Sequence, residues 1–189
     1  MTASPPSPSR DLGLRWIALR DRHRAAVTDF ATAADRVAAS AWREPMADGK
    51  WSPAQLTVHL MLACEVQLRE LETGVGPRIV TSWWVRLLLR FTVRRRLLSG
   101  DRFPEGVRSP REVRPGNPSE DQPTTIARFR DAARRLETAI EQTMGAHPRA
   151  QLTHPYLGGL SLSEALRFNA VHVRHHLRQL EAAHPLSAG

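Results

Sequence analysis

Three histidines are the residues whose type and spacing could do chemistry in this sequence. His172 and His176 are four residues apart in a segment with helical spacing, and His59 lies in another such segment. Residues four apart on a helix stack with their β-carbons about 5 to 6 Å apart, so two imidazoles can share one ion. Imidazole nitrogens are common ligands of divalent metals. The pattern therefore raises the hypothesis of a histidine metal site.

A metal requires imidazoles that converge from the packed face of each helix, and helical geometry tests this. On the last segment, His176 lies about 60° and His172 about 100° from the centre of the aliphatic sector, whereas His175 lies about 160° from it. We therefore interpret His172 and His176 as the inward pair and His175 as a flanking residue. His59 falls within about 100° of the apolar residues of its own segment. Those residues are Leu56, Leu60, Ala63 and Val66.

The spacing leaves two interpretations open. Inward histidines can be core residues that satisfy their ring nitrogens with hydrogen bonds, because burial of a polar ring without a partner is costly. A metal ion would instead satisfy one nitrogen of each of three rings at once. Nothing in the spacing itself requires His59 to meet the other two histidines.

Five helices are predicted to position these side chains, and no strand. The segment Ser52-Pro53-Ala54-Gln55 is a capping box with proline in the first turn, which predicts a helix from Pro53 to about Thr73. Ser161 to Glu164 predicts the start of the last helix, which continues to about Ala183. The other predicted helices span 14–41, 79–98 and 125–144, and long loops span 99–123 and 145–160.

The composition predicts one domain. The chain has 189 residues, of which 41% are hydrophobic, and the proline- and serine-rich residues 1–11 are expected to form a disordered tail before a domain at 12–184. No apolar run is long enough to span a membrane, and no secretory signal precedes the domain, so a cytoplasmic location is expected. The single cysteine, Cys64, excludes an internal disulfide and is expected to be buried.

Two segments carry a resemblance to a known family. The stretches KWSPAQLTVHLMLACEVQ and HPYLGGLSLSEALRFNAVHVRHHLRQLE resemble the DinB/YfiT-like family of metalloenzymes. The resemblance implies an all-α, up-down-down-up four-helix bundle, in which 79–98 would be an additional amphipathic helix. It also implies a zinc- or nickel-type site at His59, His172 and His176. Family members are often dimeric, so a homodimer is an expected assembly.

The resemblance implies a function as well. Relatives act as hydrolases or as thiol-dependent transferases and isomerases, which leads us to expect a small-molecule substrate, with a low-molecular-weight thiol as one option. Three protein nitrogens leave a coordination position open, as in catalytic metal sites. Residues for general acid or base catalysis are not determined, and four candidates stand near the histidines in the sequence. They are Glu65, Glu70, Tyr156 and Asn169.

The remaining histidines are interpreted as structural or exposed. His154 is expected to stabilise a turn in the HPYLG loop. No pattern surrounds His23, His147 or His184, so we expect them at the surface.

Two alternatives to an enzyme remain. One is a non-catalytic bundle whose metal joins two helices. The other is a basic binding module, because the formal net charge is +8 and Trp83, Trp84 and Arg94-Arg95-Arg96 could touch nucleic acid or an anionic membrane. No nucleic-acid-binding motif is present, and a basic helix face is usually only solvated, so neither nucleic acid nor membrane is expected as a partner.

Overall fold

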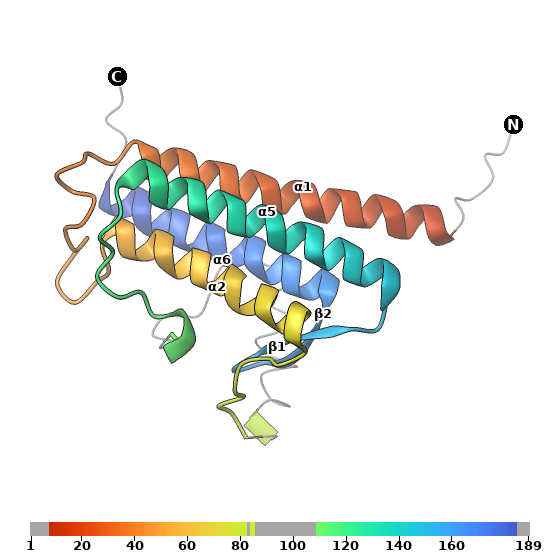
Figure 1. Cartoon of the computed structure of the whole chain (residues 1–189). Coiled ribbons are helices and arrows are strands. Elements are labelled where there is room, and N and C mark those ends of the chain that lie inside the picture. Colours follow the sequence, from red (N-terminus) through yellow and green to blue (C-terminus); the bar gives the residue numbers. More distant parts are fainter. Residues whose placement is uncertain (1–7, 83, 86–108, 185–189) are drawn as a thin grey trace, which may run out of the picture.

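Four long α-helices lie side by side in the computed structural model, which describes residues 8–82, 84–85 and 109–184 (Figure 1). They are α1 (Pro8–Asp35), α2 (Pro53–Thr73), α5 (Gln122–Ala146) and α6 (Leu162–Ala183). A short 3-10 helix, η2 (Arg111–Val113), precedes α5, and a two-stranded hairpin joins α5 to α6. The mostly helical fold predicted from the sequence is confirmed.

The two helices that carry the predicted metal ligands begin with capping boxes. In α2 the Ser52 side chain accepts from the Gln55 N–H, and the Gln55 side chain accepts from the Ser52 N–H. Gly74 ends α2 at a φ of 72°, a left-handed conformation that glycine adopts without strain. Ser161 and Glu164 form the same box at the start of α6. The predicted bounds of both helices are confirmed.

The first helix lies earlier in the sequence than its periodicity predicts. It begins at Pro8, so residues 8–11 are helical instead of belonging to a tail, and it ends at Asp35 instead of Ala41. The Gln122 side chain donates to the carbonyl oxygens of Ala34, Asp35 and Val37 at 2.7, 3.3 and 3.0 Å. A residue from the start of α5 thus satisfies carbonyl groups that the end of a helix leaves without partners.

The hairpin corrects the prediction that no strand is present. β1 (Gln151–His154) and β2 (Gly158–Ser161) are antiparallel, with Leu152 opposite Leu160. The Thr153 N–H donates to both Glu70 carboxylate oxygens at 2.9 Å, which attaches the hairpin to α2. Strands of four residues are too short to establish an alternating pattern, so tertiary contacts decide their formation.

The predicted helix over 79–98 mostly lies outside the described residues. Its first residues, 79–82, are not helical, while 84–85 are. Trp84 is exposed, and Trp83 and Arg94–Arg96 of the proposed basic binding module lie outside the described part of the chain. The basic binding module therefore stays untested by the described residues.

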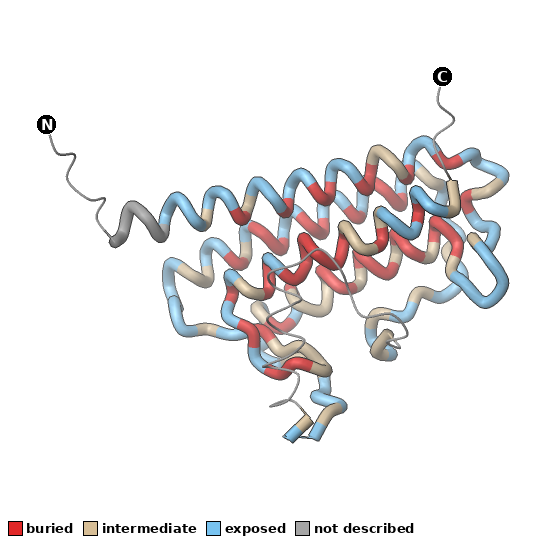
Figure 2. Tube along the Cα trace, turned by 180° about the vertical axis from the view of Figure 1, so that it is seen from behind, coloured by how far each residue is buried: buried red, intermediate tan, exposed pale blue. Residues whose placement is uncertain are grey.

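All four long helices contribute to one core, with their buried residues turned toward one another (Figure 2). Phe30 of α1 and Phe129 of α5 meet edge to face with ring centroids 5.5 Å apart. Cys64 is buried as predicted, and burial raises the pKa of its thiol to about 12. Among the described residues, no helix is both long enough and apolar enough to cross a membrane.

Candidate metal centre

Three imidazoles from α2 and α6 converge inside the bundle. The Nε2 atom of His172 lies 3.0 Å from the Nε2 atom of His59 and 3.0 Å from that of His176. The side chains are buried, with exposed fractions of 3% for His59, 9% for His172 and 7% for His176. Their ligand atoms all lie within 4.8 Å of one another, so the group could hold a metal ion. We call these three residues the histidine centre.

Two rings of the histidine centre have their proton position fixed by a partner on the far side. The Nδ1 atom of His59 lies 2.7 Å from the Val113 carbonyl oxygen, and the Nδ1 atom of His176 lies 2.8 Å from Oε1 of Gln179. Because a backbone carbonyl can only accept, Nδ1 of His59 must carry the proton, and Nδ1 of His176 carries it when the Gln179 amide turns its oxygen toward the ring. The Nε2 atom of each neutral ring therefore presents a lone pair toward His172.

The contacts at His172 fit a bound cation. A neutral His172 ring can donate at most one proton from Nε2, yet Nε2 lone pairs approach it from both His59 and His176. A cation placed among the three nitrogens would accept all three lone pairs. Nitrogens that bind one ion at about 2.0–2.1 Å are expected about 3.0–3.4 Å apart, which agrees with the two observed separations of 3.0 Å.

Electrostatics keep the rings in the neutral form that binds metal. Burial lowers the pKa of His59, although the Val113 carbonyl partly opposes this shift. Burial, followed by the neighbouring histidines, lowers the pKa of His172 well below its usual value. Burial and the nearby His59 lower the pKa of His176 to about 3. The rings are therefore neutral at neutral pH, with a lone pair on one nitrogen each, as metal ligation requires.

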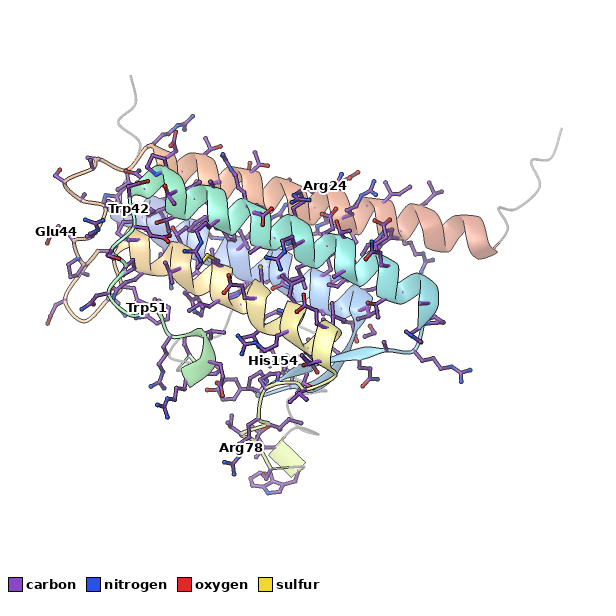
Figure 3. All side chains as sticks on the ribbon, in the orientation of Figure 1. Arg24, Trp42, Glu44, Trp51, Arg78 and His154 are labelled. Carbon is purple, nitrogen blue, oxygen red and sulfur yellow. The ribbon has the colours of Figure 1, made fainter. Side chains whose placement is uncertain are left out.

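Aromatic side chains surround the histidine centre. The Trp51 ring lies 4.8 Å from the His59 ring, and the Phe168 ring lies 5.6 Å from the His172 ring, centroid to centroid. The His154 ring meets the Phe168 ring edge to face, with the two centroids 4.6 Å apart. Figure 3 shows Trp51 and His154 beside α2, toward the two ends of that helix. These rings contribute to the burial of the centre, and charge interactions are stronger at buried sites than in water.

Comparison with known proteins identifies the family. A sequence model of the DinB superfamily matches residues 21–180, a range that includes the whole histidine centre. The chain belongs to the DinB superfamily. Neither the curated proteins nor the solved structures include a match to this DinB-superfamily protein.

His154 has the turn-stabilising role predicted for it in this DinB-superfamily protein. Its Nδ1 atom accepts from the N–H groups of Tyr156 at 3.2 Å and Leu157 at 3.1 Å. Burial lowers the pKa of His154 to about 4, so the ring stays neutral and retains this acceptor. The side chain thus closes the loop between the hairpin strands.

The candidates for acid–base catalysis are not part of the histidine centre. Asn169 and Gln67 exchange two amide hydrogen bonds of 2.9 and 3.1 Å between α6 and α2. Glu70 is buried against the hairpin, where its carboxylate accepts from the Thr153 N–H. Glu65 and Tyr156 are half-buried, and neither belongs to the three-residue group.

His23 is the clearest error of the sequence interpretation. We expected it at the surface, but its exposed fraction is 1%, and it lies where α1 packs against α5. His147 is exposed as predicted, whereas His184 is half-buried.

Sequence reasoning also missed two partners of the histidine centre: Val113, which contacts His59, and Gln179, which contacts His176. Gln179 follows His176 by three residues on one helix, a spacing that could have indicated the contact. Val113 acts through its backbone carbonyl, which leaves no signal in residue type.

Proposed function

We propose that this DinB-superfamily protein binds one divalent metal ion through the Nε2 atoms of His59, His172 and His176. The approach of two lone-pair nitrogens to Nε2 of His172, each at 3.0 Å, carries the proposal. Hydrogen bonds from the far nitrogens of ligand histidines are typical of metal sites because they fix the tautomer and ring orientation. Zinc and nickel are the proposed ions, since both accept imidazole ligands.

We further propose that the centre acts on a small molecule, by hydrolysis or by transfer or isomerisation that depends on a thiol. A metal with three protein ligands keeps a position open, where it can lower the pKa of a bound water or thiol. The protein holds the three imidazoles in their neutral form, and the rings of Trp51 and Phe168 pack against His59 and His172. Because the group contains no carboxylate, the ion's positive charge is not offset by its ligands, which favours an anionic donor such as a thiolate.

A non-catalytic role is the second candidate. The ligands come from α2 and α6, and the Gln67–Asn169 pair joins the same two helices one turn away from His172. A metal at the histidine centre would then act as a further cross-link between these helices, and its free energy of binding would stabilise the fold.

The order of the helices and the assembly state also belong to this proposal. The directions of the helices in Figure 1 support an up-down-down-up bundle, as does the long connection from Gly74 to Asp121 between α2 and α5. A homodimer and a cytoplasmic location remain predictions.

Reconstitution with zinc or nickel followed by activity assays tests the catalytic proposal. Metal-loaded protein is assayed for hydrolysis of small esters and amides and for transfer of a low-molecular-weight thiol, beside His172→Ala and the control His147→Ala. The proposal expects turnover that the first variant loses and the exposed control retains. Stoichiometric metal without turnover of any of these substrates would favour the cross-linking role.

A further inference from the structure

We propose that Gln179 is a positioning residue that holds the His176 ring with its proton on Nδ1. The consequence for metal affinity rests on the proposed function. The position of the proton itself does not, because it can be measured in metal-free protein.

The contacts follow one edge of α6. Oε1 of Gln179 lies 2.8 Å from Nδ1 of His176, and Nε2 of the same amide lies 3.0 Å from Nε2 of His175. Gln179 follows His176 by three positions and His175 by four, the two spacings at which side chains on a helix meet. Gln179 is exposed and His175 is half-buried, so the buried ligand ring is connected to the surface through one amide.

The orientation of this amide decides which nitrogen of His176 can bind an ion. With Oε1 toward His176, Nδ1 must donate, and Nε2 keeps its lone pair. With the amide reversed, its NH2 group would donate to Nδ1, and the His176 proton would move to Nε2. That proton would point at the other two histidines and occupy the position of the ion.

His175 contacts the other end of the same amide. Its Nε2 atom lies 3.0 Å from the amide nitrogen of Gln179, and in the tautomer protonated on Nδ1 it accepts a hydrogen bond from that nitrogen. The Gln179 amide is therefore held between two imidazoles of α6.

Two substitutions of Gln179 distinguish loss of the acceptor from loss of the amide. Gln179→Leu removes the acceptor while keeping a side chain of similar size on an exposed position. Gln179→Glu supplies an acceptor that cannot reverse into a donor, so it should keep the proton on Nδ1. Loss of such an outer partner typically lowers metal affinity about 10- to 100-fold.

Nitrogen-15 NMR of histidine side chains in metal-free protein at mildly alkaline pH tests the proton position. We expect His176 to be protonated on Nδ1 in the original protein and in Gln179→Glu, and to shift partly to Nε2 protonation in Gln179→Leu. Glu181→Leu, at an exposed position on the same helix, is the control and should leave the spectrum unchanged. An unchanged tautomer in Gln179→Leu would overturn the proposal.

Zinc affinity of the same proteins, measured by competition with a chelator, completes the test. We expect Gln179→Leu to bind about 10- to 100-fold more weakly and Gln179→Glu to restore the affinity. Equal affinity of Gln179→Leu and the original protein would contradict the positioning role in metal binding. A shifted tautomer together with no zinc binding by any protein would support the role of Gln179 and refute the proposed function.

Discussion

Buried histidines occur in two regions of this molecule, and their surroundings differ. At the α1–α5 interface, His23 lies with its Nδ1 atom 3.5 Å from Oε2 of Glu137, and Arg24 donates to the Glu137 carboxylate at 2.9, 3.2 and 2.5 Å. Figure 3 shows Arg24 on this side of the bundle, away from Trp51 and His154. The histidine centre between α2 and α6 contains three imidazoles and no carboxylate.

The difference lies in the charge that surrounds the histidines in each region. Burial tends to raise the pKa of Glu137, yet the nearby His23 and the hydrogen bonds from Arg24 hold it below its usual value. The Glu137 carboxylate thus supplies a negative charge beside His23 and Arg24. The histidine centre presents only neutral rings with converging lone pairs, an arrangement that suits a cation.

Removal of the histidine centre should have the largest effect on metal-dependent stability. Zinc at about 100 times its dissociation constant should stabilise the folded protein by about 2.7 kcal/mol. For a chain of this size, that corresponds to a rise of about 5 to 11 °C in the unfolding midpoint. Thermal unfolding with zinc and with a chelator should show this difference in the original protein and lose it in the double variant His172→Ala, His176→Ala. A rise that persists in the double variant would place the metal elsewhere.

Substitution in the other region should lower stability without changing metal binding. Glu137→Gln removes the anion that faces His23 and accepts from Arg24, and loss of a buried charged partner costs about 1–3 kcal/mol. Because Arg24 is largely exposed, we expect about 2 kcal/mol in urea unfolding and an unchanged zinc affinity. A weakened zinc affinity would mean that the two regions are coupled, contrary to this comparison.

Acid should lower the unfolding free energy of the metal-free protein through His154, which lies near the histidine centre. The pKa of folded His154 is about 4, below its ordinary value of 6.5, so the unfolded chain binds a proton that the folded protein excludes. Stability from this group is therefore present above pH 6.5 and is lost as the pH falls toward 4. His154→Asn keeps an acceptor for the loop without titrating. The difference in unfolding free energy between the two proteins should change by about 1.4 kcal/mol from pH 7.5 to 5.5. An equal acid dependence of both proteins would contradict this assignment.

The sequence predicts the framework of the histidine centre because the signals are local. Capping boxes at Ser52 and Ser161 set where α2 and α6 begin, and helical geometry then sets which histidines point inward. The meeting of His59 with His172 depends on packing between residues 113 positions apart, which no spacing could establish.

The errors have the same physical origin. His23 is buried because Glu137 faces it from a helix far along the chain, and the residues around His23 carry no trace of that partner. The hairpin forms where Glu70 accepts from Thr153, again a contact between distant segments. Carbonyl groups at the end of the first helix accept from Gln122 of α5, another contact between distant segments.

Metal content per chain, measured by elemental analysis of protein purified without a nickel column, tests the central claim most directly. The original protein and the double variant His172→Ala, His176→Ala are compared after reconstitution with zinc or nickel and removal of excess ion. We predict about one ion per chain in the original protein and almost none in the variant. The absence of metal from the original protein, or an equal content in both, would contradict the assignment of the histidine centre as a metal site.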